Sequence, residues 1–116
     1  MQILLTRSAD DSIQTAKALK RRRIESNIIP FLKIKRISHK KIELSSKDIL
    51  IFTSRNGARF FSHGKNKKIR VFSVGPGTKK ILQNLGFENI INTKGNINLL
   101  KKKISNYLEE NARIFH

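Results

Sequence analysis

Short apolar runs recur along the chain, and polar stretches rich in lysine, serine, asparagine and glycine separate them. The run over residues 48–52 is continuous, which is typical of a strand that is buried on both faces. Similar runs predict further strands over residues 2–6, 27–32, 69–74, 89–92 and 113–116. Pro30 interrupts one of them, because proline cannot donate to a central ladder. Residues 33–37 alternate basic with apolar side chains, as an exposed ribbon does.

Capping residues and helically spaced apolar residues occur between the predicted strands. A helix is expected from about Asp11 to Arg22, with Asp10 and Asp11 as capping residues. A second helix is expected after Ser54, and a third after the turn of residues 75–78, ending at Gly86. The clearest helix follows Gly95 and has an amphipathic face. That face comprises Ile97, Leu100, Ile104, Tyr107 and Leu108, and we expect Tyr107 to lie in the core.

Strands that alternate with helices predict an α/β protein with right-handed βαβ units and a parallel sheet. A boundary near residues 36–46 divides the chain into two parts, residues 1–36 and residues 37–116. The second part has the pattern of a larger sheet. The first part, with one helix between two strands, is too small to bury a core of its own, so it needs more polypeptide to form a complete domain.

The composition excludes several kinds of site. The chain has no cysteine, which rules out disulfides, cysteine-ligated zinc, iron–sulfur clusters and a thiol nucleophile. The apolar run at the N-terminus is far shorter than the core of a signal peptide, and no stretch approaches the length of a transmembrane helix. We therefore expect a soluble, cytoplasmic protein.

The strongest compositional bias is a formal net charge of +17, from 25 basic against 8 acidic residues. Such a charge attracts polyanions, and nucleic acid is the general candidate. The basic residues are spread over the chain, however, and are mostly not interleaved with aromatic residues that could stack on bases. Solvated helix faces and loops explain most of the charge better. A small basic α/β module that binds nucleic acid stays open as an alternative function.

Three turns at the ends of predicted strands carry hydrogen-bond donors. They comprise Thr6, Arg7 and Ser8; residues 53–56; and residues 75–78. In an open parallel sheet, ligands bind beyond the carboxyl ends of the strands, where helix N-termini offer amides to anions. The second and third turns follow consecutive strands, so we expect them along one edge of one sheet. A purely structural interpretation stays open: Thr53 or Ser54 can be a helix cap, and the glycines can serve a tight turn.

Other chemical motifs are incomplete in the sequence. Gly75 and Gly77 begin a dinucleotide-binding fingerprint whose third glycine position is occupied by lysine, and there is no phosphate-binding loop. The three histidines, His39, His63 and His116, stand outside any metal-ligand spacing, so we expect surface or loop positions for them and no metal. No acidic pair is spaced for general acid–base work.

The order of these motifs resembles the uroporphyrinogen-III synthase family. That family typically opens with a strand ending in Thr-Arg, here residues 3–7, and continues with a proline-bearing strand, here residues 28–32. A strand then runs into Phe-Thr-Ser with an asparagine soon after, matched by residues 52–56. A Val-Gly-x-x-Thr turn and a Leu-Gly-Phe sequence follow, matched by residues 74–78 and 85–87. The shared order extends over nearly the whole chain.

The resemblance implies two α/β domains joined by a two-stranded connector, of which residues 33–37 would be one strand. It implies a hydro-lyase of heme biosynthesis that closes the linear tetrapyrrole hydroxymethylbilane, with inversion of ring D and loss of water, without metal or cofactor. Holding this polycarboxylate folded in a cleft would be the main catalytic device. The resemblance makes Thr78 the expected catalytic residue; the expected substrate-binding residues are Thr6, Arg7, Thr53, Ser54, Asn56, Gly75, Gly77 and Thr78.

The resemblance covers only the first half of such an enzyme. It therefore implies a truncated or split synthase, with a second chain as the source of the missing half; a fragment without function is a further alternative. We expect the chain alone not to form the type III ring, and residues 113–116 to fray or to pair with another chain. The family's commonly small residue after the first helix is replaced, near Arg23.

Overall fold

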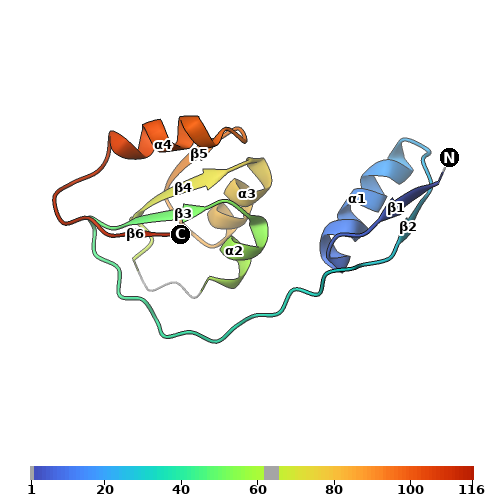
Figure 1. The fold of residues 1–116 in the computed structure, drawn as a ribbon, viewed down its shortest axis with the longest axis horizontal. Helices are drawn as coiled ribbons and strands as arrows, with labels where there is room; N and C mark the ends of the chain where they lie inside the picture. The colour runs from blue at the N-terminus through green and yellow to red at the C-terminus, as the bar shows by residue number, and fades with distance from the viewer. Residues whose placement is uncertain (1, 62–65) are drawn as a thin grey trace. The chain divides into compact units, whose positions relative to one another are not determined.

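The computed structural model describes residues 2–61 and 66–116, and His63 lies outside these residues. The chain forms two compact units, Met1–Arg36 and Ile37–His116. Strands and helices alternate in both, and the strand pairs of the described residues are all parallel (Figure 1). The expected α/β class with parallel sheets is confirmed.

The first unit contains strand β1 (Ile3–Leu5), helix α1 (Ala9–Arg21) and strand β2 (Ser26–Ile28). The two strands pair in parallel, and α1 packs against them. Helix α1 begins earlier than predicted, because Ser8 is its N-cap. Asp10 and Asp11 therefore lie in its first turn and are not its cap, and the side chain of Asp11 is buried.

Between β2 and residue 49, the chain forms no helix and no strand. The strand predicted over residues 27–32 ends earlier, at Ile28. Backbone hydrogen bonds to the first strand continue beyond it, since the N–H of Ile29 donates to the carbonyl of Leu5 and the N–H of Phe31 donates to the carbonyl of Thr6. Pro30, between them, has no N–H to donate. Residues 33–37 form no strand in the described chain, and the connector strand expected there stays a prediction. That chain offers the segment no partner strand, and a lone segment cannot form a ladder.

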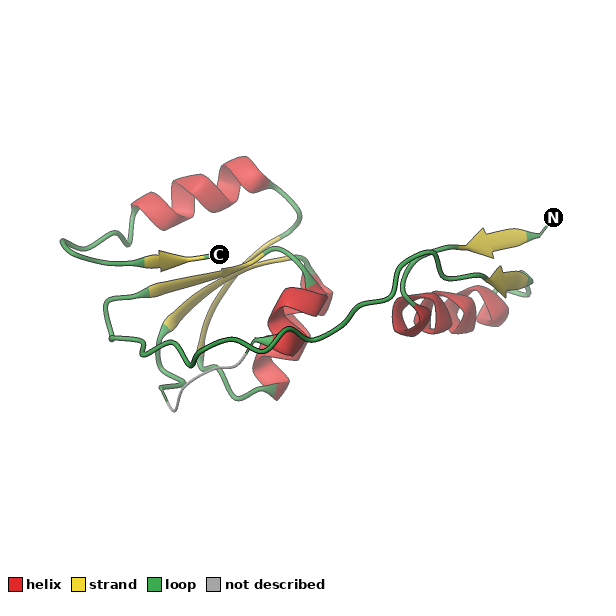
Figure 2. Ribbon diagram, turned by 60° about the horizontal axis from the view of Figure 1, so that its bottom comes forward, coloured by secondary structure: helices red, strands yellow, loops and turns green. Residues whose placement is uncertain are grey.

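The second unit is a parallel sheet between helices. Its elements are β3 (Ile49–Phe52), α2 (Arg55–Phe60), β4 (Arg70–Val74), α3 (Pro76–Asn84), β5 (Asn89–Thr93), α4 (Ile97–Ser105) and β6 (Ile114–Phe115). The strand order is β5-β4-β3-β6. Helices α2 and α3 cover one face and α4 the other (Figure 2). Right-handed crossovers dictate this arrangement, because the chain runs from β3 to β5 in one direction and returns to β6 in the other.

Both faces of the central strands are buried, as their continuous apolar runs predicted. The cluster on the α2 and α3 face comprises Leu50, Phe52, Ala58, Ile69, Val71, Leu82 and Phe87. The smaller cluster on the α4 face comprises Ile49, Phe72 and Leu100. Neighbouring residues of one strand enter opposite clusters because side chains alternate across a sheet.

The C-terminal strand corrects one expectation: β6 does not fray but is ordered within the chain. It pairs in parallel with β3, with Ile114 opposite Ile49. The buried carboxylate of Asp48 anchors its start, accepting from Nη2 of Arg113 at 2.6 Å, from Nε at 3.1 Å and from the backbone N–H of Arg113 at 3.3 Å. These contacts order the strand.

The position of Tyr107 corrects another expectation. Helix α4 ends at Ser105, so Tyr107 lies beyond it and is 41% exposed instead of lying in the core. Its ring meets Phe72 edge-on at 5.9 Å, and the guanidinium of Arg70 lies over it at 4.6 Å. Ile97 and Leu108, at the two ends of the predicted apolar face, are also exposed.

Candidate functional site

The two predicted turns of the second unit lie along one edge of its sheet. Strands β3 and β4 are hydrogen-bonded neighbours that run in the same direction, so α2 and α3 begin at the same edge. A Cβ atom added to Gly77 would lie 2.9 Å from Cδ of Arg55. The side chain of Arg55, from the start of α2, therefore crosses directly over the first turn of α3.

Two expected substrate-binding side chains of the first turn have structural partners. Ser54 is the N-cap of α2, and its hydroxyl accepts from the N–H of Gly57 at 3.0 Å. Oδ1 of Asn56 accepts from Nη1 of Arg59 at 3.2 Å. The capping role considered for Ser54 is confirmed, and both side chains stabilise the turn itself.

The second turn presents mainly backbone groups. Gly75 has a φ of 81°, which glycine adopts without strain, and its N–H donates to the carbonyl of Thr93 at 2.9 Å. In the described chain no side chain caps α3, and Pro76 has no N–H, so the amides of Gly77 and Thr78 form the positive start of this helix. The side chain of Thr78 is 3% exposed, and so it is packed within the turn.

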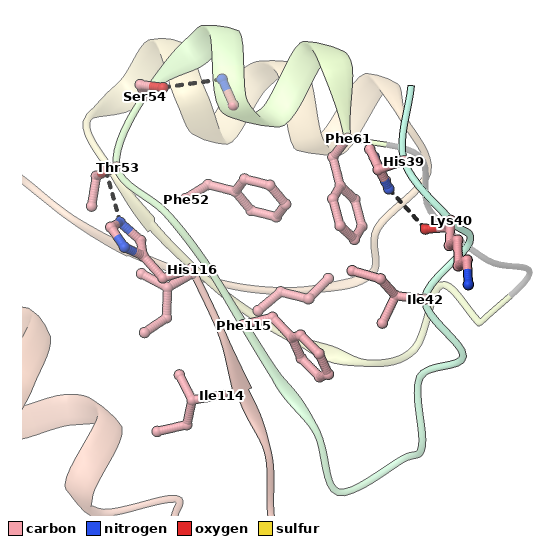
Figure 3. Close-up of a pocket in the computed structure, with 13 residues that line it drawn as sticks. His39, Lys40, Ile42, Phe52, Thr53, Ser54, Phe61, Ile114, Phe115 and His116 are labelled. Atoms are coloured by element: carbon pink, nitrogen blue, oxygen red, sulfur yellow. Dashed lines mark hydrogen bonds between the residues drawn. The ribbon is translucent and has the colours of Figure 1, made fainter. Parts of the chain in front are cut away.

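A pocket of about 700 Å³ lies beside Thr53. Strand β3, strand β6, helix α2 and the chain before β3 enclose it (Figure 3). The rings of Phe52 and Phe61 meet edge-on in its wall, with centroids 5.3 Å apart. Polar side chains stand at two ends, Thr53 with His116 at one and His39 with Lys40 at the other. Aromatic walls with polar ends suit a flat ring that carries charged substituents.

Two histidines that are distant in sequence line the pocket at its opposite ends. Both are exposed, as expected, but Nε2 of His116 lies 3.1 Å from Oγ1 of Thr53, 63 positions away. Nδ1 of His39 lies 2.8 Å from the carbonyl of Lys40, and its ring stacks on Phe61 at 6.3 Å. Sequence reasoning missed this grouping. The signal that could have revealed it is the pairing of the last strand with β3.

The third predicted turn belongs to the first unit. Nη2 of Arg7 donates to Oδ2 of Asp11 at 3.3 Å, while 62% of the arginine side chain stays exposed. The carbonyl of Arg7 accepts from the hydroxyl of Ser12 at 3.2 Å, and the carbonyl of Thr6 accepts from Phe31. The turn thus holds Arg7 at the carboxyl end of β1 with its guanidinium accessible.

Charged groups with shifted pKa values lie away from these turns. Hydrogen bonds from Arg113 hold the pKa of Asp48 well below its usual range, and the same contact raises the pKa of Arg113. Burial lowers the pKa of Lys67, whose Nζ lies 4.9 Å from the ring centroid of Phe87. The contact between Asp48 and Arg113 stabilises the fold. Among residues 2–61 and 66–116, no cluster of three or more histidine, aspartate or glutamate side chains could hold a metal ion.

Comparison with known proteins identifies the family. A profile of the family described as Uroporphyrinogen-III synthase HemD matches residues 13–116, which include the turns of the second unit and the pocket but not Thr6 or Arg7. A comparison with curated proteins found no match. In the described parts of the chain, no helix combines the length and the apolar character needed to cross a membrane. Because the profile matches most of the chain, the chain belongs to the uroporphyrinogen-III synthase family.

Proposed function

We propose that the chain forms part of the catalytic cleft of a cytoplasmic uroporphyrinogen-III synthase, a hydro-lyase. The reaction closes hydroxymethylbilane into a macrocycle: a carbon–carbon bond forms at the inverted ring D, and the hydroxyl group leaves as water. Family membership supports a tetrapyrrole as substrate. The observation that carries the proposal is the shared start of α2 and α3 at one sheet edge, beside an aromatic pocket.

The proposed roles in the second unit follow from the chemistry of each group. The amides of Gly77 and Thr78 bind a substrate carboxylate at the positive end of α3, and Arg55 adds positive charge over the same turn. The hydroxyl of Thr53 and the imidazole of His116 hydrogen-bond the substituents of one pyrrole ring in the pocket. Ser54, Asn56 and Gly75 keep the two turns in shape.

Catalysis in this proposal comes chiefly from positioning. Thr6 and Arg7 bind a further carboxylate of the substrate. Bringing the two ends of the bilane together in a reactive geometry can supply about 7 kcal/mol or more of the barrier. Thr78 supports this geometry by fixing the turn that carries the binding amides. We further propose that the chain is active only together with the remaining half of a family enzyme.

The test is to incubate the purified chain with enzymatically generated hydroxymethylbilane and to separate the ring isomers. Bilane that closes without help gives the type I ring, so type III product is the signature of the enzyme. We expect type I from the chain alone and type III after adding the C-terminal half of a full-length family member. Type III from the monomeric chain would contradict the need for a partner, and type I in both mixtures would favour a fragment without function.

A variant separates the role of Thr78 from simple stability. In the completed enzyme, Thr78→Ala should lower type III formation while the free energy of unfolding changes by about 1 kcal/mol, the central value for a point substitution. Thr78→Ser, which keeps the hydroxyl, is the matched control. Unchanged turnover with a large loss of stability would leave Thr78 with a structural role only.

The net charge of +17 keeps nucleic acid as the second candidate ligand. Binding through phosphate contacts weakens steeply as salt increases, because counterions are released. Selective binding of bilane over DNA and heparin supports the synthase. Equal affinity for all three polyanions would reduce the interaction to nonspecific charge.

A further inference from the structure

The N-cap of α3 has no side chain with which to fix the first turn of the helix. It is Gly75, and in the described chain no side chain forms a cap hydrogen bond there. The carbonyl of Gly75 accepts from the N–H of Lys79 at 3.3 Å, which is long for such a bond. Helix ends that lack better partners fray. The geometry of this helix start therefore depends on contacts from outside the helix.

The end of the neighbouring strand β5 supplies those contacts. It pairs in parallel with β4, with Asn92 opposite Ser73, so it ends beside the turn into α3. The carbonyl of Thr93 accepts from the N–H of Gly75 at 2.9 Å. The side-chain amide of Asn92 lies 2.9 Å from the carbonyl oxygen of Gly75, 3.1 Å from that of Ser73 and 2.8 Å from the Ser73 hydroxyl.

The partners of the Asn92 amide decide its orientation. Backbone carbonyl oxygens accept hydrogen bonds and cannot donate them, so the NH₂ group of Asn92, and not its oxygen, faces Gly75 and Ser73. The hydroxyl of Ser73 can donate or accept, and it suits this orientation as well. Ser73 and Thr93 are buried, so water does not readily replace these bonds. Strand β5 thus holds both the N–H and the carbonyl of Gly75.

Holding Gly75 also fixes the amides that follow it. Glycine has the most conformational freedom of any residue, so partners, and not its own sterics, keep its φ at 81°. Pro76 has no N–H, and the amides of Gly77 and Thr78 are therefore the first free donors of the helix. Because the peptide between Gly75 and Pro76 is planar, rotation of its carbonyl would redirect the whole first turn. The hydrogen bond from Asn92 opposes that rotation.

We infer that Asn92 is a positioning residue for the proposed reaction: its amide holds the carbonyl of Gly75 so that the amides of Gly77 and Thr78 meet a substrate carboxylate in a fixed geometry. The inference rests on the proposed function for the identity of that carboxylate, whereas the contact between Asn92 and Gly75 is independent of it. Donors that are ordered in advance bind an anion without a further ordering cost, so loss of the Asn92 amide weakens binding even though the backbone donors remain.

Steady-state kinetics of the completed enzyme test this role. Asn92→Ala should raise the KM for hydroxymethylbilane about tenfold and change kcat by less than about twofold, because an interaction made equally with substrate and transition state affects KM alone. A merely structural role gives the opposite result, since unfolding of part of the enzyme lowers kcat and leaves KM unchanged. That result would overturn the inference.

Two further variants separate the donor from the shape of the side chain. Asn92→Leu keeps the branched shape but has no donor, so it should raise KM as Asn92→Ala does. An unchanged KM would mean that the side chain only fills space. Asn89→Ala is the matched control, because Nδ2 of Asn89 donates to the carbonyl of Lys68 at 3.1 Å at the other end of the same strand. It should leave KM unchanged, and a rise equal to that of Asn92→Ala would refute the specific role of Asn92.

NMR spectra of the ¹⁵N-labelled chain without substrate distinguish a failure of this inference from a failure of the proposed function. Asn92→Ala should shift the amide resonances of Gly77 and Thr78 more than Asn89→Ala does. Equal shifts would refute the positioning role, whatever the chain catalyses. Larger shifts with Asn92→Ala, together with no type III ring from the completed enzyme, would confirm that Asn92 orders the start of α3 and would refute the proposed function instead.

Discussion

Replacing Asp48 by asparagine should destabilise the second unit and release β6 from β3. The Asp48 carboxylate is 1% exposed and accepts from the backbone N–H of Ser45 at 2.8 Å as well as from Arg113. Asp48→Asn keeps the shape but removes the charge and one acceptor oxygen. Hydrogen bonds to charged groups contribute about 1.5 to 3 kcal/mol, so we expect a loss of about 2 kcal/mol in the free energy of unfolding. For a unit of this size, that corresponds to about 10 °C in melting temperature.

The expected loss in the free energy of unfolding is small for a broken buried ion pair because the arginine partner is largely in solvent. Its side chain is 57% exposed, whereas that of Asp48 is almost fully buried. Water can therefore solvate the guanidinium of Arg113 once the carboxylate is gone. The released arginine is not left as a buried charge.

Urea unfolding and amide hydrogen exchange together test this prediction. Exchange should accelerate more at the amides of β6 than at the central strand β4, because the lost contacts fix β6 first. Glu110→Gln, which removes an exposed acidic side chain, is the control and should change stability by less than about 0.5 kcal/mol. An Asp48→Asn effect as small as that, or equal acceleration in both strands, would refute the reasoning.

The same contact predicts a response to acid. The pKa of Asp48 is lower in the folded state than its unfolded value of about 3.9, so the folded state binds the proton less readily. The stabilisation is therefore fully present above about pH 5 and is lost as the pH falls through 4 towards the folded pKa. The unsubstituted chain should lose more stability than Asp48→Asn over that interval. Equal losses in the free energy of unfolding of the two proteins would contradict the assignment of the acid response to Asp48.

Three further changes test individual turns. Arg23 has a φ of 60°, a left-handed conformation that glycine adopts more easily, so Arg23→Gly should raise the free energy of unfolding of the first unit by about 0.5 to 1 kcal/mol in urea titrations. Ser54→Ala removes the cap of α2 and should cost about 1 kcal/mol, while Ser54→Asp should restore most of it. Gly77→Ala brings a Cβ within 2.9 Å of the flexible Arg55 side chain; displacement of Arg55 should lower type III formation in the completed enzyme while the melting temperature stays nearly constant.

The parts of the fold that could be predicted depend on local signals. The continuous apolar run before Thr53 predicted a strand buried on both faces, and β3 contributes to both clusters. Gly75 and Gly86 have positive φ values at the start and just beyond the end of α3, as the turn chemistry indicated. Local hydroxyl chemistry likewise predicted the cap at Ser54. The position of the two turns along one sheet edge could be predicted because they follow consecutive parallel strands, whatever their side chains contact.

Contacts between distant residues could not be predicted in the same way. Asp48 and Arg113 are 65 positions apart, and neither stands in a recognisable motif. The hydrogen bond between Thr53 and His116 depends on the same strand pairing. Tyr107 satisfied the helical spacing, but α4 ended before it, because spacing specifies a possible face and not how far the helix continues.

The place of β6 was nevertheless implied by the pattern of β3, although the expectation that it would fray was wrong. A strand buried on both faces by a continuous apolar run belongs inside a sheet, with a neighbour on each edge. Strand β4 follows through a short crossover and takes one edge, and β5 continues on that side, so the other edge of β3 needs a later strand. The short apolar run at residues 114–115 is the remaining candidate in the second unit, and pairing there also gives the buried Asp48 its arginine.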